Sequence, residues 1–176
     1  MVEANLFLFG IMKNLWSPWR SKYIDSFKDE QSNDKCIFCE AIDKDVDDIK
    51  NLVVHKSTNT LIIMNLYPYN NGHLMIVPKR HLGSVDQLSV EESHELMDQI
   101  LLAEKILRKI YSPQGFNIGA NLGRAGGAGI DDHIHFHIVP RWNGDTNFMP
   151  AIGEVKVISQ DLTETKMKLL SAYAES

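Results

Sequence analysis

The sequence predicts an α+β fold with a mainly antiparallel sheet, one long helix and a short C-terminal helix. Three observations support this class. Short apolar runs separated by turn residues fill positions 52–77, a segment with helical periodicity spans 89–111, and two further apolar runs follow at 116–122 and 133–139. Strands, then one long helix, then more strands is the order typical of α+β proteins.

The first predicted strands form a hairpin. Its arms are the apolar runs Leu52–His55 and Thr60–Met64, which flank the polar residues 56–59. A third strand is expected at His73–Val77, because it follows the turn-rich segment 68–72.

One long helix is predicted next, from a capping signal to about Tyr111. Ser89 stands three residues before Glu92, which is the spacing of a capping box. Apolar residues then recur at helical spacing, at Leu96, Ile100, Leu107 and Ile110. The turn at 112–115 ends this helix.

The remaining elements complete the predicted sheet. Phe116–Leu122 has the composition of a buried strand and leads into a glycine-rich segment at 123–129. Residues 133–141 are the last predicted strand, and a short terminal helix is expected over Leu162–Tyr173.

Length and composition indicate a single globular domain. A chain of 176 residues, 44% hydrophobic and 23% charged, can bury a core. We expect an N-terminal extension and aromatic arm over 1–35, the domain over 36–150, and a C-terminal strand and helix tail over 151–176. Residues 1–11 are expected to be an upstream extension, since their apolar stretch is too short for a signal or a membrane span.

Charge and cysteine content limit the possible partners. The net charge of −5 argues against broad attachment to a nucleic-acid backbone and favours a small-molecule ligand. No export or membrane signal is evident, and the two cysteines are too few for a disulfide framework. We therefore expect a cytoplasmic protein that engages neither nucleic acid nor membrane.

The most informative segment is the run of alternating histidines, His133, His135 and His137. On a strand these side chains share one face, while Ile134, Phe136 and Ile138 take the other. The alternatives are a surface strand with fortuitous histidines or a simple metal site. Three of seven histidines gathered between 133 and 137, directly after a glycine-rich loop, favour an active-site strand.

The glycine-rich loop before this strand is a candidate phosphate cradle. Glycines at 123, 126, 127 and 129 let backbone N–H groups approach an anion. A flexible connection is the commoner role of such loops, and this one matches neither the P-loop nor the dinucleotide fingerprint. Its position directly before the histidines favours the phosphate-binding interpretation.

Imidazole chemistry assigns roles within the alternating histidines. A neutral imidazole can attack phosphorus without a strong base, which makes His135 the candidate nucleophile. Its second nitrogen must then donate its proton to an acceptor such as a backbone carbonyl. His137 is the candidate for stabilising charge on the phosphate oxygens and the departing group.

These segments resemble the histidine triad (HIT) superfamily of nucleotide hydrolases and transferases, whose signature is His-x-His-x-His followed by two apolar residues. Asn65–Pro78 resembles the family's nucleoside-binding stretch, and Asn117–Pro150 resembles its phosphate loop and active strand. The resemblance covers about residues 36–150. Trp16–Arg20 and Pro140–Phe148 look most like the bacterial branch that contains diadenosine tetraphosphate phosphorylases.

The resemblance implies site residues. His135 would carry a covalent nucleotidyl intermediate, flanked by His133 and His137. Asn65 matches a ribose contact and His73 an accessory histidine near the phosphates, although a turn-capping Asn and a satisfied core His are the commoner roles for each residue alone. The remaining candidates for nucleotide binding are Asn121, Arg124, Gly127 and Gly129. Many members carry Gln or Ser at the Gly129 position, so backbone N–H groups or Arg124 would replace that side chain.

A second site is suggested by Cys36 and Cys39, which supply two soft ligands where a tetrahedral zinc needs four. The resemblance implies that His81 and His133 complete the set, with a structural role for the zinc. The alternative is a pair of reduced thiols without metal. A redox pair is less expected, because no thioredoxin-like βαβ pattern surrounds the cysteines.

The resemblance therefore implies a hydrolase or phosphorylase of dinucleoside polyphosphates such as diadenosine tetraphosphate, and at least a homodimer. The enzyme alternative is a phosphoramidase that releases a purine nucleoside monophosphate from an amine. The other alternative is a nucleotide-binding module without turnover. Retention of all three triad histidines favours an enzyme, whereas Gly129 leaves the module open.

Overall fold

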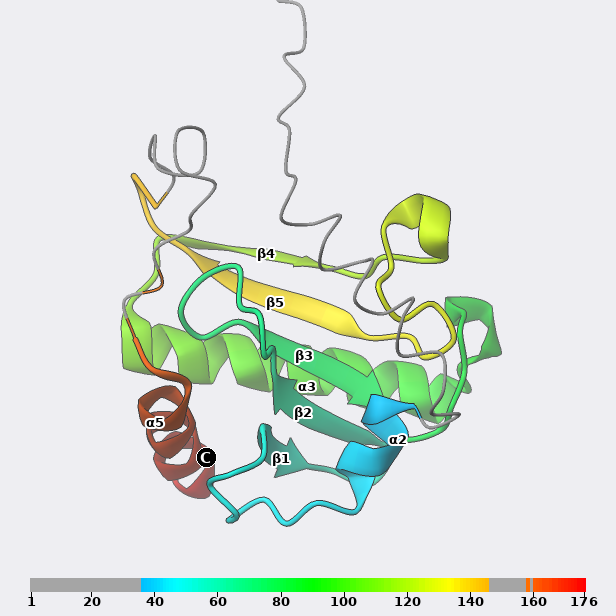
Figure 1. The fold of residues 1–176 in the computed structure, drawn as a ribbon, viewed down its shortest axis with the longest axis horizontal. Helices are drawn as coiled ribbons and strands as arrows, with labels where there is room; N and C mark the ends of the chain where they lie inside the picture. The colour runs from blue at the N-terminus through cyan, green and yellow to red at the C-terminus, as the bar shows by residue number, and fades with distance from the viewer. Residues whose placement is uncertain (1–35, 146–157, 159) are drawn as a thin grey trace, which may run out of the picture.

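The structure is a computed structural model that describes residues 36–145, 158 and 160–176. Its centre is a five-stranded sheet in the order β1-β2-β3-β5-β4, and every neighbouring pair is antiparallel (Figure 1). The strands are β1 Val53–Lys56, β2 Thr60–Met64, β3 Leu74–Pro78, β4 Gly115–Gly119 and β5 Phe136–Arg141. The α+β prediction is confirmed. The N-terminal arm and residues 146–157 lie outside the described residues.

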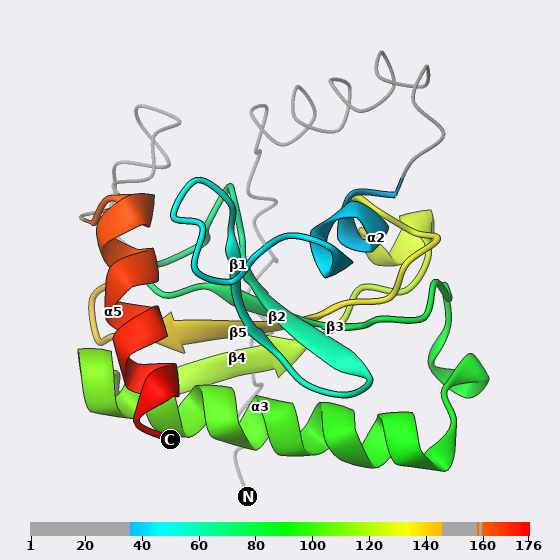
Figure 2. The same ribbon diagram turned by 90° about the horizontal axis from the view of Figure 1, so that it is seen from below.

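Helices cover both faces of the sheet. The long helix α3 (Val90–Tyr111) and the terminal helix α5 (Leu162–Ala174) lie along one side, and the short helix α2 (Ile37–Ile42) lies on the other (Figure 2). Short 3₁₀ turns, η1 (Val85–Gln87) and η2 (Arg124–Gly126), occur in the connections. No helix among the described residues is long and apolar enough to cross a membrane.

The central strands are continuous apolar runs because both of their faces are buried. In β2, Ile62 and Met64 pack toward α3, whereas Leu61 and Ile63 pack on the α2 side with Phe38. Strand β3 alternates in the same way. The α2 layer therefore covers the sheet face opposite to the main core.

Local signals set the ends of α3 as the sequence predicts. Ser89 accepts a hydrogen bond from the Glu92 N–H, and the Glu92 side chain bonds back to the Ser89 N–H. The helix ends at Tyr111, and its C-cap Ser112 has a left-handed φ of 46° and donates its N–H to the Arg108 carbonyl.

Two predictions about the last strands need correction. The Phe116–Leu122 run ends its pairing at Gly119, and among the described residues β4 is an edge strand, in which Ile118 is 46% exposed. The alternating histidines do not all lie in the ladder. Strand β5 begins at Phe136, and His133 and His135 belong to the segment that approaches it.

Candidate active site

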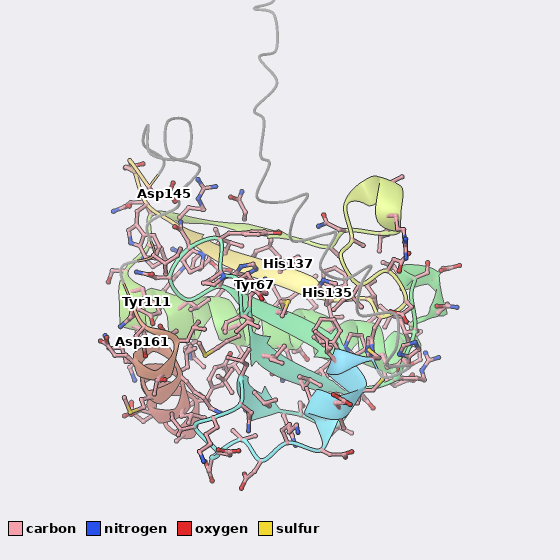
Figure 3. The ribbon with its side chains drawn as sticks, viewed as in Figure 1. Tyr67, Tyr111, His135, His137, Asp145 and Asp161 are labelled. Atoms are coloured by element: carbon pink, nitrogen blue, oxygen red, sulfur yellow. The ribbon has the colours of Figure 1, made fainter. Side chains whose placement is uncertain are left out.

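His135 and His137 are neighbours on the sheet face that α2 also covers. Phe136 and Ile138 pack toward α3, so the alternation of the strand turns His137 to the opposite face. The ring centroids of His135 and His137 are 4.9 Å apart, and Figure 3 labels both side chains along β5 and the segment before it.

The hydrogen bond of His135 fixes its tautomer. Its Nδ1 lies 2.9 Å from the His133 carbonyl oxygen, which only accepts, so Nδ1 carries the proton. Burial lowers the pKa of His135, and the bond to the carbonyl partly opposes this. A neutral ring therefore presents an Nε2 lone pair, as a nucleophile requires.

His137 belongs to a chain of hydrogen bonds that runs through His73. The Tyr69 N–H donates to His73 Nδ1 at 3.0 Å, so neutral His73 holds its proton on Nε2. That Nε2 lies 2.9 Å from His137 Nδ1 and donates to it. Neutral His137 consequently carries its own proton on Nε2, where the N–H can donate a hydrogen bond to an oxygen. Tyr69 also packs its ring 4.7 Å from that of His73.

The protonation of His137 makes the free energy of unfolding depend on pH. Burial, followed by the nearby His135, lowers the pKa of His137 to about 4. The unfolded chain therefore binds an extra proton between pH 6.5 and 4, so this contribution is fully present above pH 6.5 and is lost as the pH falls. We expect His137 to reduce the free energy of unfolding by about 3 kcal/mol over that range.

Urea unfolding from pH 7 to 4.5 checks this expectation. His137→Gln is the control, since glutamine removes the titration but can still accept the His73 proton. The two proteins should diverge below pH 6.5, with the variant less sensitive to acid. Parallel pH profiles would contradict the expectation.

Four potential metal ligands gather where α2, the loop after β3 and the segment before β5 meet. The ligand atoms of Cys36, Cys39, His81 and His133 all lie within 4.8 Å of one another. Cys36 Sγ is 3.2 Å from His133 Nδ1, and Cys39 Sγ is 3.3 Å from His81 Nδ1. Tetrahedral zinc would separate sulfur and nitrogen ligands by about 3.5 Å, so the arrangement fits.

The outer nitrogens of both histidines support the same arrangement. His133 Nε2 donates to the Pro78 carbonyl at 2.8 Å, which leaves a lone pair on Nδ1 facing the sulfurs. His81 Nε2 lies 3.7 Å from the Asp132 carboxylate. Metal-bound histidines usually have such oxygen partners on their second nitrogen. The donor set therefore fits a zinc ion.

The other predicted nucleotide-binding residues have varied surroundings. Asn65 Oδ1 accepts the Tyr67 N–H at 2.9 Å, so this side chain caps its own turn. Asn121 Nδ2 donates to the Gly127 carbonyl at 3.3 Å, and the 74%-exposed Arg124 side chain pairs with Asp131. A Cβ at Gly129 would meet nothing within 4 Å and needs no left-handed φ, so the backbone does not require glycine there.

Three residues that sequence reasoning missed shape the site. Phe38 is fully buried, and its ring centroid is 4.9 Å from that of His135. The Tyr69 backbone sets the tautomer of His73, and Asn70 lies buried beside it. The CxxC spacing draws attention to the cysteines rather than to Phe38 between them, and no pattern marks a backbone donor such as that of Tyr69.

The fold and the site define a class of small α+β proteins that present a buried, neutral histidine from a His-x-His-x-His segment. The HIT domain matches residues 46–144. The chain belongs to the HIT family.

Named relatives and one solved structure agree with this membership. The AP-4-A phosphorylase of Mycobacterium tuberculosis is 37% identical over 93% of this chain and 85% of that protein. The adenosine 5'-monophosphoramidase hnt1 of Schizosaccharomyces pombe is 30% identical over 73% of this chain and 96% of that protein. A Zn-bound histidine triad family protein from Mycobacterium smegmatis superposes with a TM-score of 0.63 at 25% identity, over 80% of this chain and 94% of that chain.

Proposed function

We propose that the protein transfers a nucleotidyl group from a dinucleoside polyphosphate of the diadenosine tetraphosphate type, to water or to inorganic phosphate. The observation that carries this proposal is the tautomer of His135, whose Nδ1 proton is held by the His133 carbonyl while Nε2 keeps its lone pair. The similarity to the AP-4-A phosphorylase over most of both chains supports the substrate class.

The side chains support a two-step reaction. His135 Nε2 attacks the α-phosphorus, a P–N bond forms, and the P–O bond to the distal phosphates breaks. The departing polyphosphate leaves as an anion, and the His137 Nε2–H donates a hydrogen bond to its oxygen. Water or phosphate then attacks the nucleotidyl-histidine, the P–N bond breaks, His135 Nε2 regains its lone pair, and any proton that the attacking group loses passes to solvent.

The nucleotide contacts in this proposal come from residues around the histidines. His73 acts through its hydrogen bond to His137. Asn65 lies at the ribose and Asn121, Arg124, Gly127 and Gly129 lie at the phosphates by resemblance. Because Gly129 has no side chain to offer, we assign phosphate binding there to backbone N–H groups.

Cys36, Cys39, His81 and His133 are proposed to hold a zinc ion. When bound, zinc would act structurally, as a four-ligand crosslink between α2, the loop after β3 and the segment before β5. His133 has a second role in this arrangement, since its carbonyl orients His135. The similarity to the Zn-bound protein of Mycobacterium smegmatis supports the choice of metal.

A homodimer is also proposed. Strand β4 is an unpaired sheet edge within the described part of the chain, and Val90, Met97 and Leu101 are more than half exposed along α3. Edge pairing and burial of such side chains are common ways for two copies to associate. Sedimentation equilibrium tests this, and a monomer at all micromolar concentrations rejects it.

The reaction is tested by incubating the zinc-loaded protein with diadenosine tetraphosphate, with and without inorganic phosphate, and separating the products by ion exchange. ADP and ATP that appear only with phosphate identify a phosphorylase. AMP and ATP formed without phosphate identify a hydrolase. If no product forms under either condition, the dinucleotide assignment is wrong.

The second candidate is a nucleoside phosphoramidase, favoured by the similarity to the Schizosaccharomyces pombe enzyme. The same nucleophile would release an amine in place of a nucleotide. Adenosine monophosphoramidate, assayed in parallel, separates the two substrates by their kcat/KM values. A protein that binds AMP but turns over neither compound would be the nucleotide-binding module instead.

A further inference from the structure

A partly buried carboxylate, that of Asp145, lies beyond the C-terminal end of β5. The Asp145 side chain is 9% exposed and accepts hydrogen bonds from Arg141 Nε at 2.6 Å, Arg141 Nη2 at 2.8 Å, the Trp142 N–H at 3.1 Å and Asn70 Nδ2 at 2.7 Å. The Arg141 guanidinium, with the help of Trp142 and Asn70, holds the pKa of Asp145 well below its usual range although burial opposes this. The carboxylate is therefore charged and firmly held.

Asn70 connects this carboxylate to the histidines. It is 8% exposed, and its Nδ2 is shared between Asp145 and the Pro140 carbonyl at 3.0 Å. The Asn70 backbone carbonyl accepts a hydrogen bond from the His73 backbone N–H at 3.2 Å. The residue before it is Tyr69, whose N–H donates to His73 Nδ1. The backbone around His73 is thus anchored at Asn70.

We propose that Asp145 and Asn70 are positioning residues that set the tautomer of His137 through Tyr69 and His73. If the loop at Asn70 relaxes, His73 Nδ1 loses its donor and the ring can move its proton from Nε2 to Nδ1. His73 then becomes an acceptor toward His137, and neutral His137 must carry its proton on Nδ1. The departing oxygen is left without a donor.

The expected effect on catalysis rests on the proposed function. The expected effect on the tautomers of His73 and His137 does not. In Figure 3, Asp145 lies at the opposite end of β5 from His135, so it does not touch the reacting atoms. A purely local role would be to hold the 141–145 turn through the Arg141 pair. Only the positioning role requires the hydrogen bond from Asn70 Nδ2 to Asp145, so removing that bond distinguishes the two roles.

Asn70→Ala is the main test, because it removes the hydrogen bond between the Asn70 side chain and Asp145 and leaves the Arg141–Asp145 pair in place. We expect kcat to fall about 10- to 100-fold, as for other small misplacements of catalytic groups, with KM nearly unchanged. Asp145→Asn should have a similar effect. The double variant should lose little more than either single one, since both act on one path.

The direct readout is the tautomer of each imidazole, measured by long-range ¹H–¹⁵N NMR. In the unchanged protein His73 and His137 should both be protonated at Nε2, and Asn70→Ala should populate the Nδ1-protonated form of one or both. Glu175→Gln is the matched control, because it neutralises a carboxylate paired at 2.6 Å with Lys109, on an exposed surface. It should change neither kcat nor the tautomers.

Unaltered tautomers in a folded Asn70→Ala protein would overturn the proposal, whatever the rate. A normal kcat in both single variants would overturn it as well. If the unchanged protein turns over neither substrate class, the proposed function fails, but the NMR comparison still decides the structural inference. Asp145→Asn keeps the test decisive if Asn70→Ala does not fold.

Discussion

Replacing His135 with alanine is expected to abolish nucleotidyl transfer and to leave the fold intact. The substitution removes the atom that forms the bond to phosphorus, and no second group replaces it, because His137 Nδ1 is occupied by His73 and its Nε2 is protonated. Loss of a covalent nucleophile typically costs at least about a thousandfold in kcat. The ring is buried against Phe38, so some loss of thermal stability accompanies the change.

Two measurements check the result. Steady-state assays give kcat. Mass spectrometry of enzyme quenched without acid should detect the nucleotidyl adduct in the unchanged protein and not in the variant. His55→Ala is the matched control, since this half-buried histidine stacks on Tyr173 on the sheet face opposite to the site. An adduct that persists after His135→Ala would place the nucleophile elsewhere.

Removal of a zinc ligand has the second large expected effect. Cys39→Ser should reduce the bound zinc from one equivalent to nearly none. A ligand present at a hundred times its Kd stabilises the folded state by about 2.7 kcal/mol. Loss of that contribution should lower Tm by roughly 5–11 °C for a chain of this size.

Elemental analysis and thermal unfolding with and without EDTA check this expectation. EDTA should lower the Tm of the unchanged protein to that of Cys39→Ser and should not affect the variant further. His55→Ala, which lies away from the cysteines, should keep its zinc. If the unchanged protein binds no zinc and EDTA leaves its Tm constant, the two cysteines are simply reduced thiols.

The parts of the fold that sequence could predict are those set by local signals. The capping box at Ser89, the helical spacing after it and the apolar runs of β2 and β3 each act over a few residues, and all are confirmed. The prediction that β4 is buried was wrong, because apolar composition does not show whether a strand has one neighbour or two. That depends on the strand order, which is a property of the whole sheet.

The candidate site divides in the same way. The alternating histidines and the cysteine pair are local patterns, and the structure brings His81 and His133 beside the cysteines as the resemblance implies. The Tyr69 N–H, Asn70 and Asp145 carry no pattern of their own. Asn70 and Asp145 are 75 residues apart, and their relation exists only after the sheet has formed.

The long sequence separation of these contacts has a consequence for the order of folding. Cys36 and His133 are 97 residues apart, whereas the β1-β2-β3 meander pairs near neighbours in the chain. Closing long loops is entropically costly, so nearby strands can pair before distant segments meet. The meander can therefore form early, whereas His135 reaches Phe38 and His137 reaches His73 only when β5 docks. Activity should consequently recover last during refolding, and a partly folded chain would be catalytically silent.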